Sequence, residues 1–203
     1  MPVFFVLFLL TAFTLIIFSI ILSFYREKEN RILEVYLSNF KKSAYISGKL
    51  SGYFAICLFY LFLSGIIYSA ILYFFGVFTP VIWAGLFSIF LKLSIIISFC
   101  LIFSSLFSSS LLALLCSIFI YAASEVAPQA VKIVSISGSK LQKIIAGALY
   151  CLLPNMDKID IKYSVIYGKL PSLAFFTSIT FYTFIYILFL WIVAILIFQR
   201  KEY

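Results

Sequence analysis

Four long stretches without a charged residue dominate this sequence and constrain its fold more than any other feature. They are Met1–Tyr25, Leu50–Leu91, Leu93–Ser124 and Leu170–Gln199. A helix that crosses a bilayer needs about 20 mostly apolar residues. Of the 203 residues, 65% are hydrophobic and 11% are charged, which leaves too few charged side chains to cover a soluble globule. The sequence therefore predicts an all-α, polytopic transmembrane helical bundle.

Turn signals divide these stretches into about five spans. Gly76 followed by Pro80 places a helix stop before a residue that favours the first helical turn. The serines between Ser104 and Ser110 form the next polar break, and Pro128 is expected to end the fourth span. The predicted spans are residues 2–25, 50–75, 81–103, 111–127 and 172–198. They make one transmembrane domain over residues 1–203, with its termini on opposite sides.

The distribution of positive charge predicts the orientation of the bundle. The first span has no basic head and no small-residue cleavage site before Arg26, so it is expected to be retained and not to act as a signal peptide. Its positive flank is C-terminal, which puts the N-terminus outside and residues 26–49 in the cytoplasm. The loop 128–171 is then external. It carries six lysines against eight basic residues inside, but the positive charge is denser in the short loop.

The composition argues against catalysis, metal binding and nucleic-acid binding by this chain. Histidine is absent, and the four cysteines form no C-x-x-C pair. Gly48-Lys49 and Gly168-Lys169 lack the G-x-x-x-x-G-K-[ST] pattern of a phosphate loop, so the chain is not expected to hydrolyse ATP. No catalytic residue, metal or cofactor is predicted. The net charge of +8 indicates anionic lipid headgroups as partners, and no nucleic-acid motif accompanies it.

The segment between the first two spans has the pattern of an amphipathic helix. Apolar residues recur at i, i+3, i+4 and i+7, namely Leu33, Tyr36, Leu37 and Phe40. The opposite face is polar, with Glu27 and Arg31 spaced for a helical ion pair. Two interpretations stay open. The apolar stripe docks on a cytoplasmic partner, or it lies in the lipid headgroup zone as an ordinary interfacial helix.

The run REKENRILEVYLSNFKKSAYISGKLSG, from Arg26 to Gly52, resembles the cytoplasmic signature of permease subunits of type-2 ATP-binding cassette transporters. That signature leads from an acidic stretch through Gly-Thr, Leu-Glu and Ser-Pro to a basic pair and Gly-Lys. The positions that match it are Glu29, Leu33, Glu34, Leu37, Ser38, Gly48 and Lys49. Asn30-Arg31 stands in place of Gly-Thr, and Asn39 in place of proline. Leu152–Gly168 is similar to the segment that these permeases place before their last span.

This resemblance implies a six-span fold with a cytoplasmic coupling helix and short external helices before the last span. It also implies a cytoplasmic ATPase partner, a second membrane subunit in a homo- or heterodimer, and export across the cell membrane. The residues expected to couple to the ATPase are Glu29, Leu33, Glu34, Tyr36, Leu37, Phe40, Gly48 and Lys49. The chain begins where the family's second span begins, so the first span is expected to be missing, to be supplied by another polypeptide, or to be lost to a wrong start codon.

Apolar residues between Val131 and Leu153 predict two short helices, broken near residues 135–139 and ended by Pro154-Asn155. They form a cap over the translocation path, as the resemblance implies, or they are helices at the lipid surface whose lysines reach the headgroups.

Lys92 and Glu125 are the charged residues placed in or near predicted spans. A charge at this depth costs about 2.5–3.5 kcal/mol, so it is usually paired or close to water. The two residues form a polar lining in the interior, or Lys92 extends its long side chain to the headgroups without a partner. The second interpretation is favoured here, since Glu125 lies closer to the surface.

The preferred function is therefore the transmembrane permease subunit of an ATP-binding cassette exporter, without ATPase activity of its own. The alternative is a non-transporting membrane scaffold or assembly subunit. A third possibility, an ion-coupled or proton-coupled carrier, requires more buried charge and an internal repeat, and no repeat is found.

Overall fold

The computed structural model describes residues 2–30, 32, 35–36, 41–76, 78–137, 141–143, 147, 153–161, 164, 168 and 170–200, and for residues 2–13, 15 and 135–137 the backbone only. Within these ranges the regular structure is helical and contains no strand, so the predicted all-α fold is confirmed. The elements are α1 (Pro2–Glu29), α3 (Lys42–Phe74), α4 (Val81–Leu106), α5 (Ser110–Ser137), the 3₁₀ turn η1 (Met156–Lys158) and α8 (Leu173–Arg200).

Four of the described helices are long and apolar enough to cross a membrane. They cover Lys42–Phe74, Val81–Leu106, Ser110–Val134 and Leu173–Arg200. The chain is therefore a helical, multi-pass membrane protein. The fifth predicted span falls in α1, where the side chains of residues 2–13 and 15 lie outside the described residues, so the count of five spans stays a prediction.

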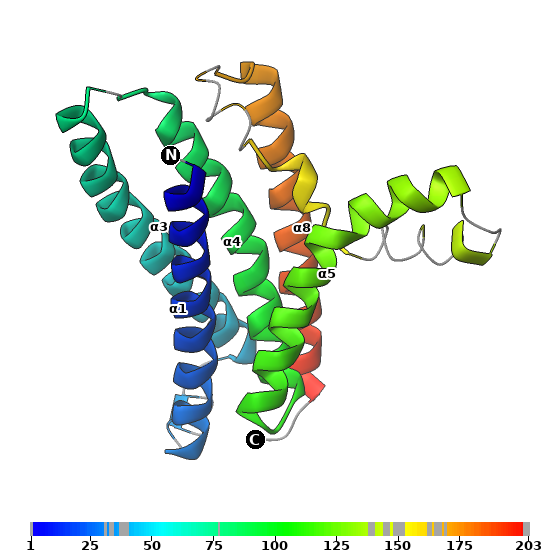
Figure 1. Cartoon of the computed structure of the whole chain (residues 1–203). Coiled ribbons are helices and arrows are strands. Elements are labelled where there is room, and N and C mark those ends of the chain that lie inside the picture. Colours follow the sequence, from blue (N-terminus) through cyan, green and yellow to red (C-terminus); the bar gives the residue numbers. More distant parts are fainter. Residues whose placement is uncertain are drawn as a thin grey trace.

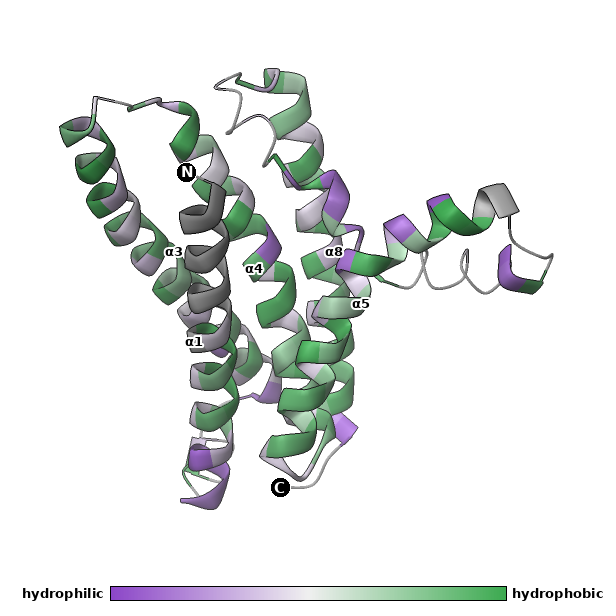
Figure 2. Ribbon diagram, viewed as in Figure 1, coloured by the Kyte–Doolittle hydropathy of each residue, from purple (hydrophilic) through white to green (hydrophobic). Residues whose placement is uncertain are grey.

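Helix α4 is the centre of the bundle. It packs against α1, α3, α5 and α8, and the two marked ends of the chain lie at opposite ends of the bundle (Figure 1). Small residues let its neighbours approach closely, as is common between membrane helices. A Cβ atom on Gly65 of α3 would lie 2.5 Å from Cδ1 of Leu86 on α4. Figure 2 shows a mostly hydrophobic α4 interrupted by a hydrophilic position.

The turn between α3 and α4 has the geometry that its sequence requires. Gly76 adopts a φ of +67°, a left-handed conformation that other residues rarely adopt, and α4 begins at Val81, directly after Pro80. At the other end of α4, the hydroxyl of Tyr25 donates to the carbonyls of Phe107 and Ser109, at 2.8 and 3.0 Å. These bonds fasten the α4–α5 turn to α1.

Helix α3 begins eight residues earlier than the predicted span. The predicted boundary at Leu50 followed charge, but the preceding turn is anchored by apolar packing. Ile46 is fully buried, and the ring of Tyr45 stacks on Phe198 of α8 with a centroid distance of 5.5 Å. The predicted cytoplasmic segment 26–49 is therefore partly helical, because α1 extends to Glu29 and α3 starts at Lys42.

The prediction that Pro128 ends the fourth helix is wrong. Helix α5 continues through Pro128 to Ser137 and bends, so that its second half points away from the other helices (Figure 1). Proline lacks an N–H and clashes with the preceding turn, which kinks a helix without necessarily ending it. The first of the two predicted short helices, from Val131, is therefore the last part of α5. Leu141–Lys143 and Gly147 are helical, and most of the second predicted helix lies outside the described residues.

Candidate functional site

Three ionisable side chains from three parts of the fold meet inside the bundle. Nζ of Lys92 on α4 lies 3.2 Å from Oε1 of Glu125 on α5 and 3.0 Å from Oδ2 of Asp160, which follows η1. The Lys92 side chain is only 5% exposed, and the two carboxylates are 25% and 18% exposed. These residues are called the ion triad below. Across the described ranges, no three His, Cys, Asp or Glu side chains gather where they could hold a metal ion.

The expectation that Lys92 reaches the headgroups without a partner is wrong. Lys92 is eleven residues from Val81, about 16 Å along the helix axis, which is farther than its side chain extends. Its ammonium stays inside because two acceptors lie at the same depth. Sequence reasoning identified Glu125 but missed Asp160. A usable signal was present: Asp160 lies between Ile159 and Ile161, a pattern typical of a buried loop and not of a solvated one.

Asp160 belongs to residues 153–161, a stretch whose regular structure is the short 3₁₀ turn η1, and which is called the buried segment below. Met156 and Ile159 are 1% and 0% exposed. The Ser88 hydroxyl of α4 donates to the carbonyl of Ile159, and the backbone N–H of Asn155 donates to the Tyr182 hydroxyl of α8 at 2.9 Å. Irregular backbone inside a membrane is tolerated where it is buried in protein or lines a wet cavity. The buried segment meets this condition by filling the space beside α4 and α8.

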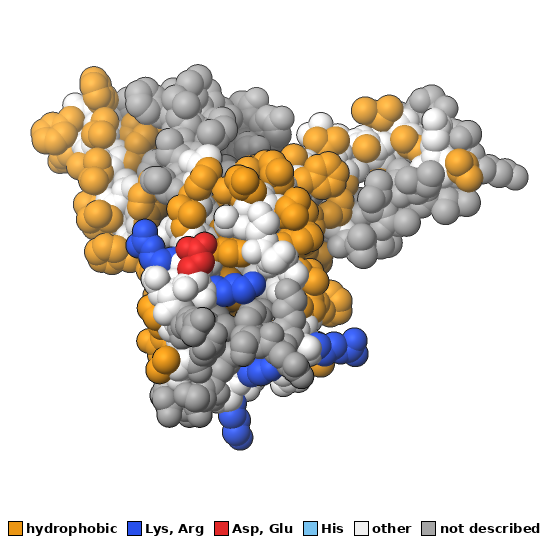
Figure 3. All heavy atoms as spheres, turned by 90° about the horizontal axis from the view of Figure 1, so that it is seen from below, with side chains coloured by type: hydrophobic (Ala, Val, Ile, Leu, Met, Phe, Trp, Pro, Cys, Tyr) orange, Lys and Arg blue, Asp and Glu red, His pale blue; other side chains and the backbone are white. Residues whose placement is uncertain are grey.

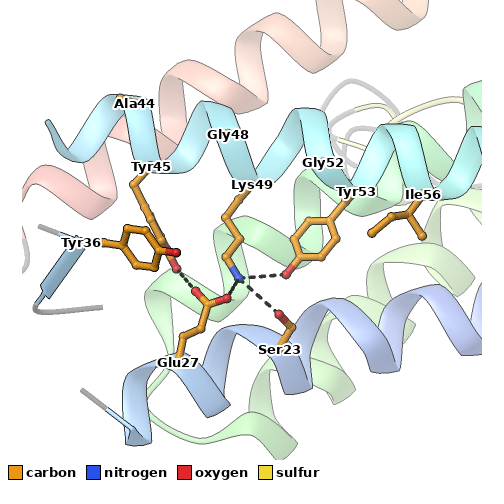
Figure 4. A pocket seen from close by; sticks show the side chains of 10 residues that line it. All are labelled: Ser23, Glu27, Tyr36, Ala44, Tyr45, Gly48, Lys49, Gly52, Tyr53 and Ile56. Atoms are coloured by element: carbon orange, nitrogen blue, oxygen red, sulfur yellow. Dashed lines mark hydrogen bonds and ion pairs between the residues drawn. The ribbon is translucent and has the colours of Figure 1, made fainter. Parts of the chain in front are cut away.

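A second polar cluster joins α1 to α3 near the end of the bundle (Figure 4). Nζ of Lys49 on α3 lies 2.6 Å from Oε1 of Glu27 on α1, and it also donates to the hydroxyls of Ser23 and Tyr53 at 3.3 and 3.2 Å. The Tyr45 hydroxyl donates to the other oxygen of Glu27 at 2.7 Å. The three N–H bonds of the ammonium are therefore all used.

Aromatic rings surround the same ammonium. The ring centroids of Phe24, Tyr45 and Tyr53 lie 6.0, 5.8 and 5.4 Å from Nζ of Lys49, within the range of cation–π attraction. Beside this cluster is a cavity of about 410 Å³. Its lining comprises Ser23, Glu27, Tyr36, Ala44, Tyr45, Gly48, Lys49, Gly52, Tyr53 and Ile56. It is called the α1–α3 cavity below.

The predicted ATPase-coupling residues do not form a single surface among the described residues. Gly48 and Lys49 line the α1–α3 cavity together with Tyr36, while Glu29 is exposed as the last residue of α1. Leu33, Glu34, Leu37 and Phe40 lie outside the described residues. Lys49 faces α1, where its counterion is Glu27, which the sequence spacing had assigned to a pair with Arg31.

This end of the bundle is rich in positive charge. Arg26 and Lys28 are in the last turn of α1, and Arg200 is in the last turn of α8. Lys41 and Lys42 begin α3, and Nζ of Lys42 donates to the carbonyl of Gln199 at 3.3 Å. Figure 3 shows Lys and Arg side chains spread over this face, with acidic ones beside them. It is called the basic end below.

A scan against protein-family models, a search of curated proteins and a search of solved structures each found no match to this chain. Its function is therefore proposed from its own sequence and geometry.

Proposed function

We propose that this chain is the transmembrane permease subunit of an ATP-binding cassette transporter, working as an exporter in the cell membrane. A separate cytoplasmic ATPase supplies the energy, and two membrane subunits form the complete translocation unit. The observation that carries the proposal is the ion triad of Lys92, Glu125 and Asp160 in the bundle interior. Ionisable residues inside spans are costly, and they mark substrate or ion pathways more often than they serve packing.

The surroundings of the ion triad support this assignment. The triad holds two carboxylates against one ammonium, so polar groups with unequal charge are kept inside an apolar bundle. Asp160 lies in the buried segment. One hydrogen bond from the Ser88 hydroxyl attaches this segment to α4, and one hydrogen bond from the segment to the Tyr182 hydroxyl attaches it to α8. Because this segment lies outside the long helices, a movement of its Met156 and Ile159 out of their packing would not require a helix to unfold. We place the translocation path along α4 beside this segment.

The cluster at the basic end gives a mechanical link to an ATPase. Helix α1 packs on α4 and α5, whereas α3 packs on α4 and α8. The ion pair between Glu27 and Lys49 joins α1 to α3 at the point where the predicted coupling segment leaves and re-enters the bundle. Force applied to residues 30–41 thus reaches both helices together. Both act on α4, which carries Lys92.

The test is a reconstitution with the cognate ATPase. A tagged chain is purified from its native membrane, the ATP-binding cassette ATPase that accompanies it is identified by mass spectrometry, and ATP hydrolysis is measured in nanodiscs with and without the chain. Leu37→Glu is expected to abolish both co-purification and stimulation, because a helix docked in a groove depends on individual apolar anchors. The wild-type chain should increase the rate of hydrolysis.

Val35→Glu is the matched control, since Val35 lies on the same segment, is 63% exposed and is not part of the apolar stripe. It should retain the ATPase. If Leu37→Glu keeps its partner and full stimulation, docking through this stripe is wrong. A chain that neither binds nor stimulates an ATPase, and whose deletion disperses a larger membrane complex, would favour the scaffold alternative.

A further inference from the structure

The α1–α3 cavity has a graded lining, of which the transport proposal uses only the ion pair of Glu27 and Lys49. Its polar side holds Glu27, Lys49 and the Tyr45 hydroxyl, and its other side continues along α3 through Gly52 to Ile56 (Figure 4). The lining changes from these polar groups near the basic end to Ile56, which is exposed on the outer face of α3. A cavity that changes from polar to apolar over this distance suits an amphiphilic molecule better than a wholly polar or wholly apolar one.

Two glycines keep the cavity open. A Cβ atom added to Gly48 or to Gly52 would meet no heavy atom within 4 Å, so the space beside this face of α3 is unfilled. Ala44 continues the same helical face toward the basic end. At the other end, Ile56 is 61% exposed and is followed at helical spacing by Phe59, 67% exposed. A hydrocarbon chain can therefore lie along this face from the cavity into the lipid.

The charges near the mouth favour an anionic headgroup. The last turn of α1 carries Arg26 and Lys28. Lys41 directly precedes α3, Lys42 is its first residue and Lys49 lies two turns further on, so that five cationic side chains stand against Glu27 and Glu29. The charge of Glu27 is compensated within the cavity, because its carboxylate lies 2.6 Å from Nζ of Lys49 and also accepts from Tyr45. The remaining field is positive, and basic residues at this position attract the anionic lipids of a membrane surface.

We propose that the α1–α3 cavity binds an anionic phospholipid from the leaflet at the basic end. One acyl chain lies against Gly48, Gly52 and Ile56, and the phosphate stays at the mouth among the cationic side chains. The ion pair of Glu27 and Lys49 forms the polar floor on which the glycerol part rests. The bound lipid fills the gap between two helices that meet here through side chains. This site does not depend on the transport function.

The experiment is native mass spectrometry of the purified full chain, titrated with phosphatidylglycerol or with phosphatidylcholine of the same acyl chains. The wild-type chain should retain one phosphatidylglycerol with about tenfold higher affinity, equivalent to about 1.4 kcal/mol. The double variant Gly48→Leu/Gly52→Leu fills the cavity and should lower the phosphatidylglycerol affinity to the phosphatidylcholine level. Ala55→Leu is the matched control, because Ala55 is exposed on α3 outside the cavity lining, and it should bind like the wild type.

Three further measurements complete the test. Raising the salt concentration, or Lys41→Gln, should reduce the preference for phosphatidylglycerol. Millimolar inorganic phosphate should not displace the lipid, since the acyl chain contributes to binding. The single variant Ala44→Leu narrows the same cavity and replaces the double variant if the latter does not fold.

Equal affinity for the two lipids would overturn the proposal, as would displacement by phosphate. The proposal would also be wrong if a folded leucine variant of the cavity bound phosphatidylglycerol with the affinity of the wild type. A leucine variant that loses its ATPase but keeps the lipid would make the cavity a protein-docking site, and the lipid assignment would then be wrong.

Discussion

Lys92 connects α4 to two other parts of the interior, because its ammonium pairs with carboxylates of α5 and of the buried segment. The sequence identifies Lys92 as an anomaly, since it interrupts an apolar stretch that otherwise runs from Leu50 to Ser124. The cost of burying its charge made a pair with Glu125 one of two interpretations, but the favoured one, a Lys92 that reaches the headgroups without a partner, was wrong. The flanking residues Ile159 and Ile161 indicate that Asp160 is buried, but its contact with Lys92 could not be predicted, because it depends on how a loop 68 residues away folds back on α4. Pairing across such a distance is set by tertiary packing and not by local pattern.

Removing the Lys92 ammonium should destabilise the protein. Lys92→Leu leaves two carboxylates without their cation, and breaking a buried pair in this way costs about 3–5 kcal/mol. The triple variant Lys92→Leu/Glu125→Gln/Asp160→Asn removes all three charges and should recover most of this loss. Thermal unfolding in detergent measures both variants. Lys132→Leu is the control, because Lys132 is 74% exposed and its pair with Asp157 at 3.4 Å should contribute at most about 1 kcal/mol. If the losses of stability of the three single variants add up to the loss of the triple variant, the three charges are not coupled.

The same variants separate structure from transport. A triple variant that regains stability but does not export substrate places the ion triad on the path. If export recovers together with stability, the triad has a structural role alone, and the proposal loses the observation on which it rests.

At the scale of elements, the apolar pattern predicts where helices exist better than where they end. Val81 begins α4 as expected, because Gly76 and Pro80 act locally. Pro128 was expected to end α5 but only bends it, since the rest of the helix can continue beyond one missing N–H. The sequence did not predict that α3 begins at Lys42, because the charge pattern placed the boundary at Leu50. Its first turns look polar, yet Ile46 packs in the core.

The buried segment should loosen when its bond to α8 is removed. Tyr182→Phe deletes the acceptor of the Asn155 N–H, which costs about 1 kcal/mol and should speed local opening about fivefold. Hydrogen exchange of residues 153–161 reports the change, while α4 should keep its protection. Tyr73→Phe is the control, because Tyr73 is 75% exposed at the end of α3. Unchanged exchange in the buried segment would show that this bond does not hold it.

At the scale of the whole molecule, hydropathy and charge give the class of protein and a topology that can be tested. The turn between α3 and α4 lies at the end of the bundle opposite the basic end (Figure 1). In a background without the native cysteines, Ser43→Cys and Phe78→Cys mark the two ends. A membrane-impermeant thiol reagent on intact cells should label Phe78→Cys, since Phe78 is 43% exposed, and should leave Ser43→Cys unlabelled. The reverse pattern would invert the predicted orientation.

The long-range ion pair between Lys92 and Asp160 also sets the order in which the protein can be completed. At about 5–20 residues per second, a ribosome needs about 3–14 s to make the 68 residues that separate them. During that interval α4 has been synthesised, but one of its two counterions has not. Glu125 arrives 33 residues after Lys92 and can hold the ammonium first. Tyr182, which anchors Asn155, is made later still. The ion triad is thus complete only after Asp160 has been made, and the buried segment gains its bond to Tyr182 only after α8 has been made, so membrane insertion of α4 and final folding are separate events in time.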